Sequence, residues 1–171
     1  MLDIITYPNK LLYSKSDDVK DFDDNLHKFL DDLYETMISS SGIGLAAIQV
    51  ARPVNIFIIN LLNEEEKQDK NDLIEFINPK ITPLSDKKII YEEGCLSVPG
   101  FFEDVARFEK IKVDYQDRFG NDKTLEAEGL LAVAIQHEND HLNGHLFIEK
   151  ISHLGRKKLE KHIKDSKKTK K

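Results

Sequence analysis

The sequence predicts an α+β fold in which largely antiparallel sheets pack around a buried central helix, with a further helix towards each terminus. Three observations predict this class. Strand-like segments come mostly before the central helix, and strands and helices do not alternate regularly. Two of these segments flank a turn-forming stretch, which is typical of a β-hairpin. Residues 130–142 are apolar on nearly all sides in their first half, which indicates a buried helix.

Length and composition indicate one globular domain that spans residues 1–171. The hydrophobic fraction of 40% and the charged fraction of 33% are ordinary for such a protein. No apolar run reaches the roughly eighteen residues of a membrane span, and the N-terminus lacks the pattern of a secretory signal. The single cysteine excludes an internal disulfide. We therefore expect a cytoplasmic protein with no membrane partner.

Positive charge is concentrated at the C-terminus. Residues 156–171 contain nine Lys or Arg against Glu160 and Asp165, a balance of +7 in a chain of net charge −6. The other 155 residues therefore carry −13. A basic C-terminal helix on an acidic body suggests an anionic partner such as RNA, although a solvated tail explains the charge equally well.

The elements before the central helix follow from periodicity. We expect residues 1–22 to be irregular and a helix to begin at Asp23 or Asp24, where an acidic cap precedes apolar residues spaced three and four apart. His27 on this helix has no recognisable partner, so we interpret it as a surface residue. Strands are expected at 54–62, 73–77, 88–91, 111–115 and 123–127, an exposed loop at 63–72 and a hairpin turn at 117–122.

The central helix carries the pattern His137-Glu138-x-x-His141. Residues i and i+4 lie on one helix face because an α-helix has about 3.6 residues per turn. The two imidazoles can therefore bind one metal ion, while Glu138 lies within reach of a water molecule on that ion. The same face carries Leu130, Val133 and Ala134, which places the histidines against the core. A polar surface face is the alternative, and the apolar surroundings argue against it.

A catalytic metal site has three protein ligands and an open position, so a third ligand is needed. The extended zinc-peptidase motif would supply a third histidine, but Phe147 occupies that position and His145 falls two residues short. Cys95, in a loop bounded by glycine and proline, is the better candidate. A lone cysteine is more often a small buried hydrophobic residue.

Two glycines, Gly42 and Gly44, precede an apolar segment that contains Gln49. Glycine permits unusual backbone dihedrals or close approach to a ligand. The third glycine and the preceding strand of a dinucleotide-binding site are missing, so we reject dinucleotide binding as the function of this segment. Gln49 is either a satisfied structural group or an amide donor that stabilises an oxyanion.

Residues 42–50, 93–99 and 136–141 together resemble the three signature motifs of the peptide deformylase family, in the same order. The resemblance extends from the first helix to about Ile151. It implies a metal-dependent hydrolase that removes the N-formyl group from the initiator methionine of nascent polypeptides and releases formate. It also implies that Cys95, His137 and His141 bind the metal. Ferrous iron is the metal that the family favours, and zinc, nickel or cobalt can replace it.

The resemblance also assigns the chemistry. Metal-bound hydroxide would attack the formyl carbon with Glu138 as general base and then general acid. The side-chain amide of Gln49 and the backbone N–H of Leu96 would stabilise the oxyanion. The peptide would lie extended along Ile43, Gly44 and Gly94. The methionine side chain would enter a pocket formed by Ile43, Tyr91, Leu130, Val133 and Ala134.

Two further expectations concern the surroundings of this site. Glu93 would be costly to bury alone, so we expect an ion pair with Arg107. The basic segment 156–171 resembles in placement the helix by which some members of the family bind the ribosome, whereas nothing predicts a specific DNA partner. A zinc endopeptidase, a hydrolase with Cys95 as nucleophile, and a metal-sensing or RNA-binding protein without catalysis are the competing functions.

Overall fold

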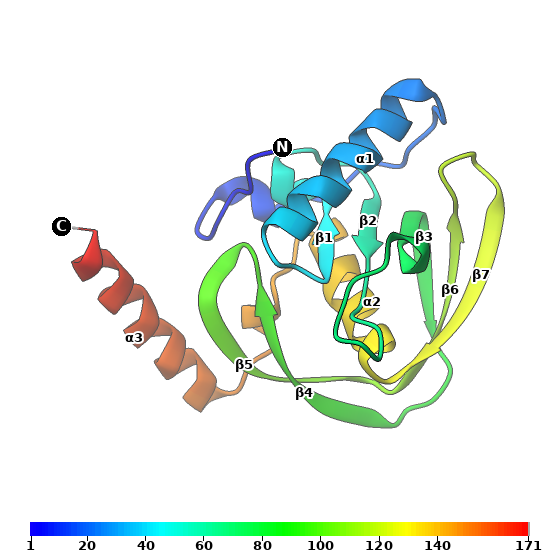
Figure 1. Cartoon of the computed structure of the whole chain (residues 1–171). Coiled ribbons are helices and arrows are strands. Elements are labelled where there is room, and N and C mark those ends of the chain that lie inside the picture. Colours follow the sequence, from blue (N-terminus) through cyan, green and yellow to red (C-terminus); the bar gives the residue numbers. More distant parts are fainter. Residues whose placement is uncertain (171) are drawn as a thin grey trace.

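Helix α2 lies at the centre of the molecule, between a five-stranded antiparallel sheet and a separate two-stranded hairpin (Figure 1). The computed structural model describes residues 1–170 and confirms the α+β class. The sheet has the strand order β1-β2-β3-β6-β7, and β4 pairs with β5 in the hairpin. The elements in chain order are η1 (Lys10–Tyr13), α1 (Asp24–Ser39), β1 (Gly44–Ala46), η2 (Ala47–Val50), β2 (Ile56–Ile59), η3 (Lys70–Asp72), β3 (Ile74–Pro83), β4 (Lys88–Cys95), β5 (Val98–Phe108), β6 (Lys110–Gln116), β7 (Asp122–Glu128), α2 (Gly129–Leu142), η4 (Phe147–Glu149) and α3 (His153–Thr169).

Strand β2 shows how the sheet separates two hydrophobic clusters. Its four residues, Ile-Phe-Ile-Ile, are all buried. Consecutive side chains of a strand point to opposite faces, so both faces of the sheet must be covered here. Phe57 and Ile59 pack with α2, whereas Ile56 and Ile58 pack with α1. The sheet is therefore covered by α1 on one face and by α2 on the other.

Helix α1 begins where the acidic residues predicted it. The Asp23 side chain accepts a hydrogen bond from Leu26 N at 3.0 Å and caps the first turn. The interpretation of His27 as a surface residue without a partner is wrong. Its ring is partly buried, its Nε2 lies 2.8 Å from the Arg118 carbonyl oxygen, and it packs edge-on against Phe119. These partners come from the distant β6–β7 turn, so local sequence gave no sign of them.

Several strands differ from those expected, and β2 covers only Ile56–Ile59 of the expected 54–62. Strand β3 continues to Pro83 and β4 continues to Cys95, well beyond the predicted ends at 77 and 91. Strand β5 was not expected at all. Gly44 begins the short edge strand β1, which was not expected, and a 3-10 turn follows it. Within residues 1–22, Lys10–Tyr13 also form a 3-10 turn.

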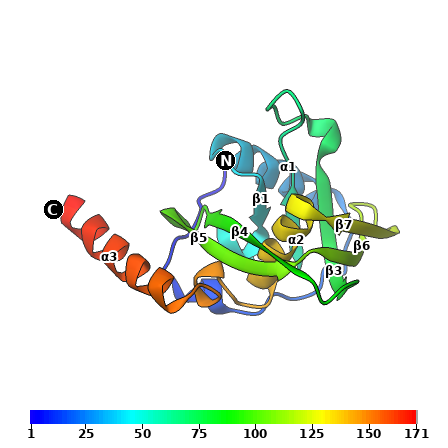
Figure 2. The same ribbon diagram turned by 90° about the horizontal axis from the view of Figure 1, so that it is seen from below.

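The C-terminal helix α3 extends away from the rest of the molecule (Figures 1 and 2). Ser152 caps its first turn, and Gly155 and Leu159 are its buried residues. Leu159 packs with Phe101 and Phe147 in a third hydrophobic cluster beneath the β4–β5 hairpin. The last turns, towards Thr169, are exposed. No helix within residues 1–170 is both long enough and apolar enough to cross a membrane.

Candidate metal centre and pocket

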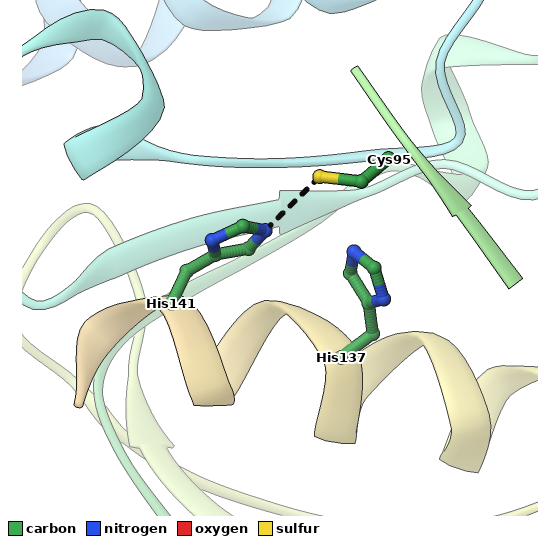
Figure 3. A group of neighbouring side chains, drawn as sticks. All are labelled: Cys95, His137 and His141. Carbon is green, nitrogen blue, oxygen red and sulfur yellow. Dashed lines mark hydrogen bonds between the residues drawn. The ribbon is translucent and has the colours of Figure 1, made fainter. Parts of the chain in front are cut away.

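Cys95, His137 and His141 converge in the interior of the molecule (Figure 3). Cys95 is the last residue of β4, and the two histidines project from consecutive turns of α2. One potential ligand atom from each residue lies within 4.8 Å of the other two. At the end of β4 the pairing register shifts, so that Gly94 pairs with Phe102 but Cys95 pairs with Val98. Such a bulge redirects a side chain, here towards α2.

The three side chains fit a metal ion. Cys95 Sγ lies 3.4 Å from His141 Nε2. Tetrahedral coordination at zinc-like bond lengths places a sulfur and a nitrogen ligand about 3.5 Å apart. A thiolate and two imidazoles also form a donor set that suits iron, zinc, nickel and cobalt.

A carboxylate orients one of the two histidines. His137 Nδ1 lies 2.7 Å from Glu93 Oε1, and because an ionised carboxylate only accepts, Nδ1 carries the proton. In the neutral imidazole Nε2 then carries no proton and can act as a ligand. His141 Nδ1 is different: it is buried and has no hydrogen-bond partner among residues 1–170.

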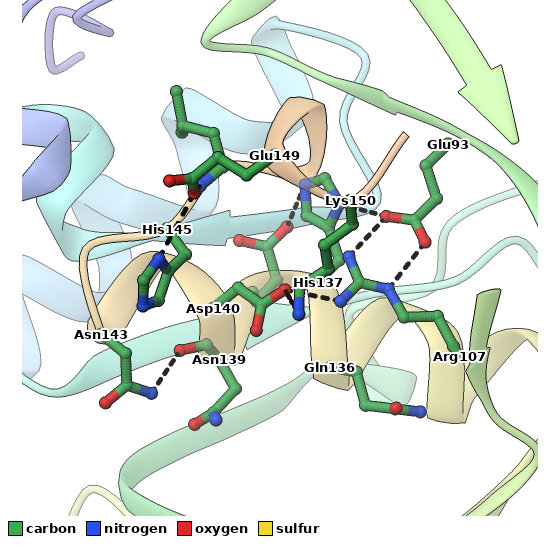
Figure 4. Close-up of polar contacts among 12 residues, drawn as sticks. Glu93, Arg107, Gln136, His137, Asn139, Asp140, Asn143, His145, Glu149 and Lys150 are labelled. Atoms are coloured by element: carbon green, nitrogen blue, oxygen red, sulfur yellow. Dashed lines mark hydrogen bonds and ion pairs between the residues drawn. The ribbon is translucent and has the colours of Figure 1, made fainter. Parts of the chain in front are cut away.

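Glu93 belongs to a buried ionic network (Figure 4). Arg107 Nε and Nη2 each donate to a Glu93 carboxylate oxygen at 2.8 Å, which confirms the expected pair. Asp140, which the sequence did not suggest, accepts from Arg107 Nη1, and Lys150 Nζ lies 3.8 Å from Asp140. Burial alone would raise the pKa of Glu93, but the hydrogen bonds from Arg107 and His137 outweigh burial and lower that pKa to about 2.

Glu138 lies beside the three candidate ligands and faces β1. Its Oε1 is 4.0 Å from His137 Nε2, and its Oε2 is buried without a hydrogen-bond partner among residues 1–170. Burial and the nearby charge of Glu93 raise the pKa of Glu138 to about 7, although His137 opposes this. A Cβ atom at Gly44 would lie only 2.7 Å from Glu138 Oε1. Close approach, rather than an unusual dihedral, is therefore what requires glycine at this position.

Gln49 reaches the same site from the 3-10 turn after β1. Its side chain is 1% exposed, and its Oε1 accepts a hydrogen bond from Ala46 N at 2.9 Å. Its Nε2 lies 3.1 Å from Ser97 Oγ and 3.4 Å from Cys95 Sγ. Gln49 is thus a satisfied structural group whose amide also faces the candidate metal ligands.

A cavity of about 510 Å³ opens above these residues. It brings together every residue for which the sequence suggested a role in substrate binding, and also Leu96. The seven substrate-binding candidates are Ile43, Gly44, Tyr91, Gly94, Leu130, Val133 and Ala134. His137 and Glu138 form part of its wall, whereas His141 is buried behind them.

The sequence missed one prominent wall residue, Phe102. Its ring lies against Gly94, where a Cβ atom would come 2.3 Å from the ring, and the side chain is 61% exposed at the rim of the cavity. Phe102 belongs to β5, which showed no clear strand pattern. Nothing in the sequence around Phe102 indicated that its side chain lies at the rim of a cavity.

The fold and the site together define a class of protein. A partly buried thiol and two buried imidazoles beside a buried carboxylate, at one side of an apolar cavity, are typical of a metal-dependent hydrolase. Residues 1–157 match the family model of polypeptide deformylase. The chain belongs to this family.

Individual relatives agree with the family assignment. A peptide deformylase of Campylobacter jejuni is 59% identical over 165 residues, which cover 96% of this chain and 94% of that protein. One from Helicobacter pylori is 57% identical over 171 residues, covering 100% and 98% of the two chains.

Solved structures show the same fold. A peptide deformylase structure from Plasmodium falciparum superposes with a TM-score of 0.88 at 37% identity, covering 98% of each chain. One from Synechococcus elongatus in complex with actinonin gives a TM-score of 0.88 at 37% identity, covering 96% of this chain and 87% of that one.

Proposed function

We propose that this chain removes the N-formyl group from the initiator methionine of nascent polypeptides, releasing formate and a free amine. The main supporting observation is the convergence of Cys95, His137 and His141 beside an apolar cavity whose wall includes Cys95, His137 and Glu138. Membership of the polypeptide deformylase family supports the substrate class.

Cys95, His137 and His141 would hold one divalent metal ion. Such an ion, when bound, lowers the pKa of a water molecule towards neutrality. We assign ferrous iron as the native metal because the sequence motifs are those of a family that favours it, and zinc, nickel or cobalt would also fit this donor set.

Glu138 would act as general base and then as general acid. It would accept the proton of the attacking water and deliver it to the departing nitrogen of the substrate. Burial raises the pKa of Glu138 to about 7 before a metal ion is bound, which favours acceptance of a proton. The unpaired Oε2 is the atom available to accept that proton.

Gln49 and Leu96 would stabilise the transition state. The side-chain amide of Gln49 and the backbone N–H of Leu96 would donate hydrogen bonds to the oxygen that becomes negatively charged. The extended peptide would lie along Ile43, Gly44 and Gly94 through main-chain hydrogen bonds, which accept almost any downstream sequence.

The initiator methionine would be bound by side chains around the cavity. Its side chain would lie against Ile43, Tyr91, Leu130, Val133 and Ala134, all of which line the space above Glu138. An apolar wall of this kind favours an unbranched thioether side chain.

Formate release tests this proposal. The purified chain, loaded with ferrous ion under anaerobic conditions, should release formate from formyl-Met-Ala and should leave acetyl-Met-Ala intact. A chain that binds one metal ion but releases no formate would contradict the proposed function. Activity that survives complete removal of metal would instead favour Cys95 as a nucleophile.

We further propose that residues 1–171 act as one catalytic unit in the cytoplasm, and that the basic segment 156–171 binds the ribosome. Lys171 lies outside the described residues. Leu159 and Ile163 pack on the hydrophobic cluster beneath the hairpin, while Lys164, Lys167 and Lys168 are exposed. The exposed basic residues of α3, which include Lys157 and Lys161 as well as those beyond Ile163, are therefore available to RNA phosphates.

Charge reversal tests the ribosome proposal. Lys164→Glu with Lys168→Glu should weaken ribosome binding in a salt-dependent manner and leave formate release from formyl-Met-Ala unchanged. The matched control reverses Lys10 and Lys20, two exposed lysines outside α3. Equal weakening in both variants would show that only net charge matters and would contradict a role for α3.

A further inference from the structure

Ser97 is a fully buried residue that no step of the proposed reaction uses. It lies in the short turn between β4 and β5, two residues after Cys95, with no exposed surface. Its hydroxyl oxygen accepts a hydrogen bond from Gln49 Nε2 at 3.1 Å. A buried side-chain contact of this kind joins the two segments that supply Gln49 and Cys95.

The contacts of Gln49 fix both ends of its amide. Oε1 accepts from Ala46 N at 2.9 Å, and this backbone donor excludes the flipped orientation. One Nε2 hydrogen is bonded to Ser97 Oγ, and the other faces Cys95 Sγ at 3.4 Å. Sulfur is a weaker acceptor than oxygen, so this hydrogen can be shared with a substrate oxygen at little cost, whereas the bond to Ser97 anchors the group.

The N-terminal segment supports the same two residues. Ile5 N donates to the Gln49 carbonyl oxygen and Tyr7 N donates to the Ser97 carbonyl oxygen, both at 2.8 Å. Ile5 and Tyr7 also pack, as Cys95 does, against the third hydrophobic cluster. The backbones of positions 49 and 97 are therefore held by one short segment, so the distance between the two side chains is fixed from outside the cavity.

We propose that Ser97 is a positioning residue for the reaction: its hydroxyl holds the Gln49 amide so that one Nε2 hydrogen remains directed at the reacting oxygen. This inference rests on the proposed function, in which Gln49 donates to that oxygen. Loss of the Ser97 hydroxyl leaves Oε1 of Gln49 bonded to Ala46 N but removes the anchor of Nε2, so the amide can turn about the remaining contact. The cost therefore falls on turnover and not on substrate binding, because the donor is needed most strongly in the transition state.

Ser97→Ala tests the proposal by kinetics. We expect kcat for formyl-Met-Ala to fall about tenfold, a fraction of the loss typical for removing an oxyanion donor, with KM changed less than twofold. In a Gln49→Ala background, Ser97→Ala should lower kcat less than twofold, because the group that it positions is gone. Equal losses in both backgrounds, or an unchanged kcat in the single variant, would overturn the proposal.

Two variants separate positioning from general destabilisation. Ser97→Thr retains the hydroxyl and should retain near wild-type kcat, and a threonine enzyme as slow as the alanine enzyme would count against the proposal. Ser16→Ala is the matched control, because Ser16 is 3% exposed and its hydroxyl has no hydrogen-bond partner among residues 1–170. It removes a buried hydroxyl elsewhere and should leave kcat unchanged.

A readout independent of turnover comes from the side-chain amide of Gln49. Its two NMR proton signals should be well separated in the zinc-loaded wild-type chain and should move towards those of exposed glutamines in Ser97→Ala, with metal content still one per chain. Unmoved signals would refute the contact whatever the kinetics. Absence of formate release by the wild-type chain would contradict the proposed function and leave this NMR result as the test of Ser97.

Discussion

Gly44 and Glu138 are separated by 94 positions in sequence, yet a Cβ atom at position 44 would lie 2.7 Å from Glu138 Oε1. The carboxylate of Glu138 occupies the space that a side chain at position 44 would need. This close approach explains why a glycine precedes the buried residues Leu45 and Ala46 in β1, where a larger residue would otherwise suit the strand better.

Gly44→Ala should therefore lower activity by displacing Glu138. We expect kcat to fall by about a hundredfold, because a shift of roughly 1 Å in a catalytic group has effects of that size. Formate release measures the loss, and thermal unfolding checks that the fold persists. The same substitution in a Glu138→Gln chain should cause little further loss, and a full additional loss there would contradict this explanation.

Glu138→Gln tests the proton transfers directly. The amide has nearly the same shape but accepts no proton from water, so kcat should fall by about 10²–10⁴. Metal content measured by elemental analysis should remain one per chain, since the three candidate ligands are untouched. Unchanged formate release with full metal content would exclude Glu138 as the base.

The ionic network of Glu93, Arg107 and Asp140 joins the elements β4, β5 and α2. Glu93 and Arg107 are nearly fully buried, with 4% of each side chain exposed. Removing one partner of such a pair costs about 3–5 kcal/mol because it leaves a buried charge uncompensated. The network therefore stabilises the relative positions of the hairpin and of the helix that carries His137.

This network predicts a specific acid sensitivity. The folded-state pKa of Glu93 is lowered from 4.5 to about 2, so its stabilising contribution is present above pH 4.5 and is lost as the pH falls towards 2. The shift corresponds to roughly 3 kcal/mol. The difference in free energy of unfolding between wild type and Glu93→Gln, measured by urea titration, should shrink across that interval.

A surface carboxylate provides the control for this titration. Glu126 is exposed on β7, and Glu126→Gln should follow the wild type at every pH. A constant gap between wild type and Glu93→Gln from pH 5 to pH 2.5 would show that Glu93 keeps an ordinary pKa.

Strand β5 could not be read from sequence for two physical reasons. Val98, Phe101 and Val105 are buried, but Gly100 adopts φ +74° between the first two and shifts the alternation of side chains. Arg107 then occupies an inward position where a hydrophobic residue would be expected. Its partners Glu93 and Asp140 make this possible, and they are distant in sequence. Both features depend on tertiary contacts.

On the scale of the whole molecule, the candidate metal centre is a second link, besides the ionic network, between the hairpin and the central helix. Cys95 comes from the two-stranded hairpin, whereas His137 and His141 belong to the helix that packs on the five-stranded sheet. An ion held by all three would link these parts and stabilise only the folded chain.

Metal removal should therefore affect both activity and stability. Incubation with 1,10-phenanthroline should abolish formate release and lower Tm, and added metal should restore both. A free metal concentration of a thousandfold Kd corresponds to about 4 kcal/mol of stabilisation. Cys95→Ser should show a reduced response to added metal, and an identical rise in Tm would place the metal elsewhere.

The helical spacing of His137 and His141 was sufficient to predict a shared site, because helix geometry fixes that relation locally. The place of Cys95 beside them depends on the register shift at the end of β4, which local patterns do not encode. Similarly, the apolar stripe predicted that Val133 and Ala134 are buried, whereas Phe102 at the cavity rim and Asp140 in the ionic network became evident only from tertiary structure.

The chain has one thiol, and it is the sulfur at the candidate metal centre. An occupied centre would shield that sulfur as a bound thiolate, so a colourimetric thiol reagent would count vacant centres and nothing else. Added to partially loaded enzyme, the reagent should consume one equivalent per metal-free chain and none per loaded chain. Oxidation of this same atom would inactivate the enzyme irreversibly once it passed beyond the sulfenic acid. The reactivity of this thiol therefore reports how many centres are occupied, and a metal-free chain is open to inactivation by peroxide.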